Sequence, residues 1–249
     1  MRGPSRGFTL YGKRKTFGQK LISFFLYLLL ILLAYLVITS MFLQSFAVES
    51  VSMSPTILPG DRILSSPLTA GARIPLLPLR LPALGKLERG DLVIVRSPIH
   101  FEKDIISMAL RPISRFFTAQ QSDLSFSSAR EWEQEVLLKR IIGIPGDTII
   151  MKDYIAYIKP ADSSDFISEF RISNTEYTTL SKAVPENWKE DFPFSGSIES
   201  ETLEENEYFL LGDNRVESVD SRYWGALRSE AIVSKVFLRY WPTGSIGRP

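Results

Sequence analysis

The residue types available for chemistry in this chain are limited by what it lacks. Its 249 residues include no cysteine and one histidine, His100. The sequence therefore excludes a disulfide framework, a thiol nucleophile and thiolate metal sites, and imidazole zinc sites need several histidines. A hydroxyl is the remaining candidate nucleophile, and its usual base is a histidine. Because no motif surrounds His100, we expect it to be a surface or packing residue rather than a base.

Ser52, in the run SVSMSPT at residues 50–56, is a candidate nucleophile, and Lys139 is a candidate base. A lysine can activate a serine only as a neutral amine, and at the ordinary pKa of about 10.4 only about 1 in 2,500 lysines is neutral at pH 7. Such a base must be desolvated, because burial lowers the pKa of an amine. Lys139 lies in the strand-like apolar run VLLKRIIGIPGD, residues 136–147. On this local pattern alone, a strand lysine that points to solvent is an equally good interpretation.

A third polar cluster, GDNRVESVDSRYWG at residues 212–225, follows the apolar run YFLL. Its acids, amide, arginines and hydroxyls suit a loop that crosses a site and orients a base through hydrogen bonds and ion pairs. An ordinary polar hairpin loop also uses Gly, Asp and Asn. Taken together, the three clusters predict a hydrolase with Ser52 as the nucleophile and Lys139 as the base.

These clusters follow a stretch that we predict to be a membrane anchor. Residues 21–43, LISFFLYLLLILLAYLVITSMFL, carry no charge, Pro or Gly. As a helix they would extend roughly 34 Å, which suits a hydrocarbon core of about 30 Å. A cleaved signal peptide would have an apolar region of only about 7–15 residues. Six basic residues precede the stretch and residues 44–60 contain none, so residues 1–20 are predicted to be a cytoplasmic tail and residues 44–249 to lie across the membrane.

The outer part, residues 44–249, is predicted to be mainly β, an antiparallel sheet that is curled or barrel-like, with loop insertions. Short runs rich in Val, Ile, Tyr and Phe alternate with Gly, Pro, Asp and Asn, which is typical of strands and turns. The predicted insertions are residues 65–89, 99–135 and 160–205, the last resembling long hairpin loops. The insertion 99–135 includes a possible helix at residues 104–117, mostly apolar with two arginines. Such an apolar, basic segment beside an anchor can lie on the membrane surface or pack on its own domain. A poorly formed hydrophobic stripe favours packing.

Four blocks of this sequence, in the same order, resemble those of the type I signal peptidases. These are the membrane-bound Ser–Lys proteases that remove signal peptides from exported proteins. The blocks are SVSMSPT, RGDLVIV, KRIIGIPGD and GDNRVESVDSRYWG, and the closing IVSKVFLRYWP fits as well. The resemblance spans nearly all of the outer domain.

The resemblance implies a role for each matched residue. Ser52 matches the nucleophile, Lys139 the general base and Ser218 the hydroxyl that positions this base. Ser50 matches a serine whose side chain joins the Ser52 backbone N–H in the oxyanion hole. Asp220 and Arg222 match a supporting ion pair that holds the loop, and Arg140 and Asp213 match residues that look structural. The residues matched to shallow apolar pockets for small side chains, with an Ala-X-Ala preference, are Phe46, Val48, Met53, Ile57, Ile63 and Leu138.

The resemblance also implies a location and partners. The protein is expected to be a single-pass protein of the bacterial cytoplasmic membrane, with its N-terminus inside and its catalytic domain on the outer side, in a periplasm or a cell-wall space. Exported preproteins, membrane lipid and the secretion translocon are the expected partners, with no nucleic acid and no metal or organic cofactor. The sequence departs from the family at Val51, where glycine is usual, and at Val216 and Glu217, where Asp-Asn often follows GDNR.

Two other functions fit parts of the sequence. A self-cleaving repressor-type Ser–Lys protease would be soluble with a DNA-binding domain, whereas this chain has an apolar stretch and no basic recognition helix. A non-catalytic, membrane-tethered β-domain that binds envelope partners would also have this composition. That alternative predicts that Ser52→Ala has no effect, and it leaves the ordered blocks unexplained.

Overall fold

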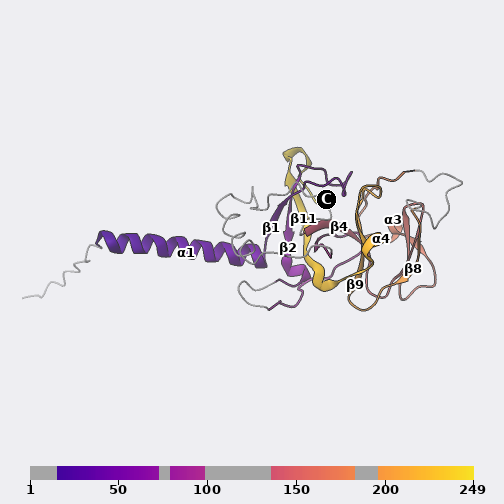
Figure 1. The fold of residues 1–249 in the computed structure, drawn as a ribbon, viewed down its shortest axis with the longest axis horizontal. Coiled ribbons are helices and arrows are strands. Elements are labelled where there is room, and N and C mark those ends of the chain that lie inside the picture. The colour runs from indigo at the N-terminus through magenta and orange to yellow at the C-terminus, as the bar shows by residue number, and fades with distance from the viewer. Residues whose placement is uncertain (1–15, 73–78, 99–135, 183–195) are drawn as a thin grey trace, which may run out of the picture.

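The protein is described by a computed structural model that covers residues 16–72, 79–98, 136–182 and 196–249. One long helix projects from a body of β-strands (Figure 1). The proposed insertion at 99–135, with His100 and the possible helix within it, lies outside the described residues, as does most of the basic tail.

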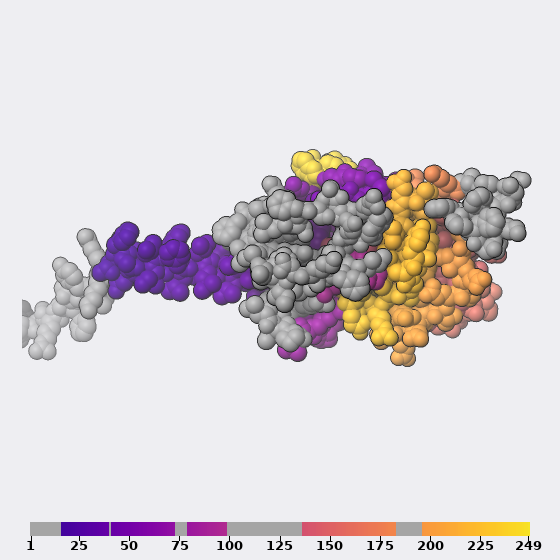
Figure 2. Space-filling model, in the orientation of Figure 1, coloured from indigo at the N-terminus to yellow at the C-terminus, as the bar shows by residue number. Residues whose placement is uncertain are grey.

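The helix α1 spans Phe17–Met41, so it begins four residues before the apolar stretch seen in the sequence. Thr16 caps it: the Thr16 side chain accepts from the Gln19 N–H, and the Gln19 side chain accepts from the Thr16 N–H. This reciprocal capping box starts the helix early, before hydrophobicity alone would. Residues 17–39 are long and apolar enough to cross a membrane, and no part of this span is buried inside the protein. Figure 2 shows α1 standing clear of the β body.

The body contains two antiparallel sheets, which confirms the mainly β prediction. The larger sheet has seven strands in the order β1 (Gln44–Ala47), β2 (Arg62–Ser66), β11 (Ile232–Trp241), β3 (Leu92–Arg96), β4 (Val136–Gly143), β9 (Glu207–Leu211) and β10 (Leu227–Arg228). The smaller sheet has four, in the order β7 (Ile167–Ser168), β6 (Ile155–Lys159), β5 (Thr148–Lys152) and β8 (Ile198–Thr202). Among the described strands the outer strands of the larger sheet do not pair with each other, so no closed barrel is found.

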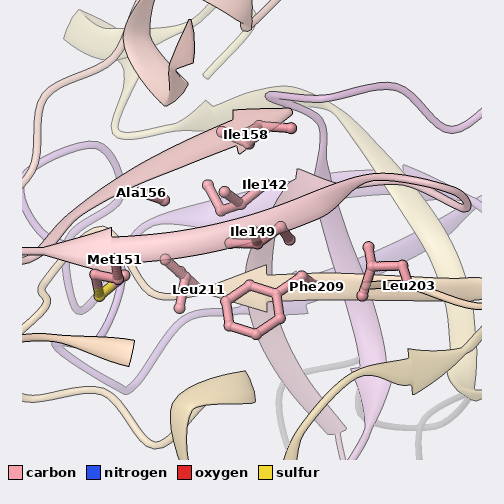
Figure 3. Close-up of a cluster of buried hydrophobic side chains, with 8 residues drawn as sticks. All are labelled: Ile142, Ile149, Met151, Ala156, Ile158, Leu203, Phe209 and Leu211. Carbon is pink, nitrogen blue, oxygen red and sulfur yellow. The ribbon is translucent and has the colours of Figure 1, made fainter. Parts of the chain in front are cut away.

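Three buried apolar clusters hold the sheets together, and β4 contributes to all of them. Figure 3 shows the cluster that joins the smaller sheet to β4 and β9, with Phe209 among the aliphatic side chains of β5 and β6. Six of the eight β4 residues are buried, including every residue from Lys139 to Gly143, so this strand is covered on both faces. A lysine in such a strand, here Lys139, is shielded from solvent on both faces of the sheet.

The described parts of the stretch 160–205, residues 160–182 and 196–205, contain more secondary structure than the sequence indicated. They contain β7, the short helix α3 (Glu169–Ile172) and β8, rather than hairpin loops alone. The other short helices among the described residues are η1 (Pro67–Ala70), α4 (Ser221–Trp224), η3 (Ser229–Ala231) and η4 (Thr243–Ser245). Glu169 of α3 belongs to this polar stretch, yet its side chain is buried. It can therefore pair with a buried residue of the site.

Candidate active site

Ser52 lies in a turn that follows β1, close to the end of the membrane helix in the chain. The residue is 2% exposed, and its backbone N–H donates to the Ser50 hydroxyl over 3.2 Å. The two groups that the resemblance assigns to an oxyanion hole are therefore neighbours. For both to donate to one substrate oxygen, the Ser52 N–H must exchange the Ser50 oxygen for that of the substrate.

Lys139 is fully buried in the middle of β4, opposite Val93 of β3. Its Nζ donates to the Ser218 hydroxyl over 3.0 Å. The alternative that this strand lysine points to solvent is therefore wrong. The structure joins the predicted base to the predicted positioning hydroxyl, although 79 positions separate them in the chain.

Gly212 lies where the nucleophile turn and the loop carrying Ser218 approach each other. A Cβ at position 212 would come within 2.2 Å of the Ser218 hydroxyl oxygen and within 2.6 Å of the Ser52 carbonyl oxygen. Real Cβ contacts are not this short, so only glycine allows this approach. Ser52, Ser218 and, through its hydrogen bond, Lys139 thus converge at one point.

We expect Gly212→Ala to reduce turnover by about 100-fold or more, because its methyl must push Ser218 or the Ser52 backbone aside and misplaced groups lose about that much rate. The measurement is the initial rate of preprotein cleavage. Gly244→Ala is the matched control, since nothing lies within 4 Å of a Cβ at 244. Equal activity of the two variants would show that this close approach is not needed.

The loop is braced on one side by the predicted ion pair between Asp220 and Arg222. Arg222 Nε and Nη2 donate to the two carboxylate oxygens over 2.7 and 2.8 Å, and Arg222 Nη2 also donates to the Ser218 carbonyl over 3.2 Å. Burial alone would raise the pKa of Asp220, but the hydrogen bond and charge of Arg222 hold that pKa below its usual value. Asp220 also accepts from the Gly212 N–H over 3.0 Å, so the pair holds the backbone at both Gly212 and Ser218, whose hydroxyl contacts the Lys139 amine.

A second buried pair joins β4 to the same loop. Arg140 donates to both carboxylate oxygens of Asp213 over 2.8 and 2.7 Å and to the Gly90 carbonyl over 2.7 Å. The Thr56 hydroxyl donates to Asp213 over 2.5 Å, which ties the nucleophile turn to this pair. Arg239 of β11 holds the turn from the other side by donating to the Thr56 carbonyl over 2.9 Å.

A third pair, Arg215 with Glu169, is absent from the sequence-based predictions. Its two guanidinium nitrogens donate to the two carboxylate oxygens over 2.8 and 2.6 Å, and both side chains are buried. Arg215 Nε also donates to the Gly212 carbonyl over 3.0 Å, and the Tyr177 hydroxyl donates to Glu169 over 2.6 Å. The available signal was Arg215 itself, since a buried arginine needs a carboxylate partner. The sequence did not identify Glu169 as the partner of Arg215, because Glu169 lies in a polar stretch that carries no motif.

We expect Glu169→Gln to lower the free energy of unfolding by about 3 to 5 kcal/mol, because it leaves the buried Arg215 guanidinium without a countercharge. Urea unfolding of the full chain in detergent measures this. Glu199→Gln, at an exposed position of β8, is the control and should change stability little. Similar stability of both variants would mean that Arg215 finds other acceptors.

Asn214 joins the loop directly to the nucleophile turn. Its backbone N–H donates to the Ser52 carbonyl over 2.9 Å and its side-chain amide to the Val51 carbonyl over 3.3 Å. The departures from the family pattern take part in these contacts only through their backbone: the Val51 carbonyl accepts from Asn214, and the Glu217 N–H donates to the Asn214 side-chain oxygen over 3.2 Å. Their side chains are not buried, since Glu217 is exposed, Val216 is half-buried and Val51 is 42% exposed. The unusual residues are thus at the rim, and the loop still reaches the turn.

The six predicted pocket residues lie in one apolar cluster of the larger sheet. Val48, Met53, Ile57 and Ile63 are buried in it, and Phe46 and Leu138 pack against it while partly exposed. Phe46 and Leu138 therefore keep part of their apolar surface accessible, whereas Met53, Ile57 and Ile63 lie within the core.

Comparison with known proteins gives consistent matches. The family model described as signal peptidase, peptidase S26, matches residues 21–241. A signal peptidase I of Buchnera aphidicola subsp. Acyrthosiphon pisum is 27% identical over 263 residues, which cover 93% of this chain and 81% of the relative. Signal peptidase I of Pseudomonas fluorescens is 27% identical, covering 85% and 70%, and that of Bacillus caldolyticus is 32% identical, covering 63% and 72%. The crystal structure of a signal peptidase I from Enterococcus faecalis V583 has 22% identity and a TM-score of 0.30, covering 60% of this chain and 96% of that chain.

Proposed function

The chain belongs to the signal peptidase family, peptidase S26, and from this premise we propose that it is a membrane-anchored serine endopeptidase that removes signal peptides by a Ser–Lys dyad. The observation that carries this proposal is the buried hydrogen bond from Lys139 Nζ to Ser218 Oγ, beside the Gly212–Ser52 approach. Burying an amine in the core of a sheet costs free energy of folding. A lysine kept there in spite of that cost supports a role in proton transfer.

In the proposed reaction, the neutral Lys139 amine takes the proton of the Ser52 hydroxyl while its oxygen attacks the scissile carbonyl. The Ser50 hydroxyl and the Ser52 N–H stabilise the negative charge on the carbonyl oxygen. The Lys139 ammonium then gives its proton to the leaving amine, and the mature N-terminus departs. Lys139 next takes a proton from water, which attacks the acyl-enzyme ester and releases the signal peptide with Ser52 restored.

The proposed substrate is an exported preprotein whose cleavage region is extended. An extended peptide binds by adding a strand, with alternate side chains entering pockets. The partly exposed Phe46 and Leu138 would contact these side chains, and their closely packed cluster supports a preference for small residues of the Ala-X-Ala type.

The proposed topology has one span, with residues 1–20 in the cytoplasm, an anchor in 21–43 extended by the observed α1, and a catalytic domain at 44–249 on the periplasmic side of the bacterial inner membrane. The six basic residues before the span support this orientation. Contacts with lipid and with the secretion translocon are part of this proposal.

The direct test mixes the purified full chain in detergent with a preprotein and maps the new N-terminus by mass spectrometry. We expect one cut after a small residue, and we expect its loss when the residue before the cut is changed from Ala to Phe. No cut, or a cut that ignores this change, would contradict the proposed specificity.

A further inference from the structure

The segment that follows α3, residues 173–180, connects the smaller sheet to the site loop, and we call it the strap. We propose that Tyr177 of the strap is a positioning residue for the reaction, because it joins the buried ion pair of Arg140 to the buried ion pair of Arg215. Through this junction it keeps the nucleophile turn and the loop that carries Ser218 in one alignment. The inference rests on the proposed Ser–Lys proteolysis and adds to it a residue that acts through other residues.

The strap is held on both sides of Tyr177 by the backbone of the site. Before it, the Thr175 hydroxyl donates to the Gly90 carbonyl over 3.1 Å, and Arg140 donates to this same carbonyl over 2.7 Å. After it, the Leu180 N–H donates to the Asp213 carbonyl over 2.9 Å. With both ends fixed in this way, the position of the Tyr177 ring is set by the site and not by a free loop.

Tyr177 contacts one member of each pair. The centre of the Arg140 guanidinium lies over the Tyr177 ring, 4.0 Å from the ring centroid, which is a cation–π contact. The Tyr177 hydroxyl donates over 2.6 Å to Glu169, the carboxylate that binds Arg215. Phe170 of α3 packs beside the same ring, with the ring centroids 5.4 Å apart. Tyr177 therefore holds one pair through its ring face and the other through its hydroxyl.

The hydroxyl of Tyr177 is a permanent donor. Burial and the negative charge of Glu169 raise the pKa of Tyr177 far above its usual value, because both disfavour the phenolate. The phenol is thus protonated throughout the physiological pH range. Its contacts hold the two pairs together at every such pH and do not form a pH switch.

The joined pairs hold two neighbouring residues of the site loop, Gly212 and Asp213. Arg140 binds the Asp213 carboxylate, which also accepts from the Thr56 hydroxyl of the nucleophile turn over 2.5 Å. Arg215 donates to the Gly212 carbonyl over 3.0 Å, where the nucleophile turn meets the loop. Without the Tyr177 junction the two arginines can shift separately, and a misplacement of about 1 Å costs about 100-fold in rate.

Two substitutions at Tyr177 separate its contacts. Tyr177→Leu removes the ring contact with Arg140 and the hydrogen bond to Glu169, whereas Tyr177→Phe removes only the hydrogen bond. For preprotein cleavage by the full chain in detergent, with rates normalised to folded protein, we expect kcat to fall about 30- to 100-fold for Tyr177→Leu and about 3- to 10-fold for Tyr177→Phe. KM should stay within about twofold of the wild type, because the apolar surfaces of Phe46 and Leu138 are unaltered.

The control is Tyr157→Phe, at a half-buried position of β6, which should keep the wild-type kcat. Figure 1 shows α3 on the side of the body away from α1, so these changes leave the anchor intact. A purely structural Tyr177 would lower the midpoint of unfolding and leave the kcat of the folded protein unchanged, and that result would overturn the inference. A wild-type chain that cleaves no preprotein would instead overturn the proposed function itself. The milder Tyr177→Phe keeps the test valid should Tyr177→Leu not fold.

A double substitution tests the route through which Tyr177 acts. Thr56→Val and Tyr177→Leu both loosen the Arg140–Asp213 pair, so together they should lower kcat by clearly less than the product of their separate factors. Thr56→Val combined with Tyr157→Phe is the control and should give the simple product. A simple product for the first combination would show that Tyr177 does not act through Arg140, and the proposal would then be wrong.

Discussion

Replacing Ser52 with alanine is expected to abolish preprotein cleavage, with kcat/KM falling by about 10⁴-fold or more, because the nucleophile is lost while the binding surfaces remain. Ser52 is buried beside Ser50 and is the only one of the two whose backbone also contacts the loop that carries the base-positioning Ser218. The measurement is single-turnover cleavage of a preprotein by the full chain in detergent. Ser54→Ala, two residues further along the same turn, is the control and should stay within severalfold of the wild type.

The Ser52 variant should remain folded and remain in the membrane fraction, since α1 and the sheets do not depend on this hydroxyl. Cleavage that persists at near the wild-type rate would eliminate Ser52 as the nucleophile. It would return the chain to the alternative of a tethered β-domain, for which this substitution has no effect.

The sequence could place the chemical residues in elements but could not orient them. Lys139 is in a predicted strand, yet the run VLLKRII has no alternation, because β4 is buried on both faces. Which face Lys139 occupies is decided by Val93 of β3 and by Ser218 in a distant loop. Tertiary contacts of this kind leave no periodic signal in the strand itself.

The ion pairs that brace the site show the same limit of sequence-based prediction, because partners far apart in the chain cannot be paired from the sequence. Asp220 and Arg222 are two residues apart, so the sequence could suggest their pairing. Glu169 and Arg215 are 46 residues apart, and Glu169 lies in a polar stretch that indicated loops. Only the packing of α3 against β6 brings that carboxylate to the GDNR loop. The observed start of α1 differs from the predicted start for a local reason. The Thr16–Gln19 capping box begins the helix before the apolar run starts.

Replacing Lys139 with methionine is expected to lower the rate of acyl-enzyme formation by about 10³- to 10⁴-fold, because the Ser52 hydroxyl loses its base. Methionine has a similar length and shape and no amine, so the packing of β4 is kept. The measurement is again single-turnover cleavage, compared with Lys152→Met, an exposed lysine at the end of β5 that should leave the rate unchanged.

The stability of the Lys139 variant distinguishes a base from a structural lysine. Burying an amine opposes folding, so an apolar side chain of the same shape should leave the midpoint of unfolding unchanged or raise it, while activity falls. A lysine kept only to hold Ser218 would give the opposite pattern, with lower stability and cleavage that recovers once the protein is folded at low temperature. Near wild-type cleavage by a folded Lys139→Met protein would rule out Lys139 as the base. A folded, more stable and inactive variant would assign to that amine the proton transfer that its burial against Ser218 implies.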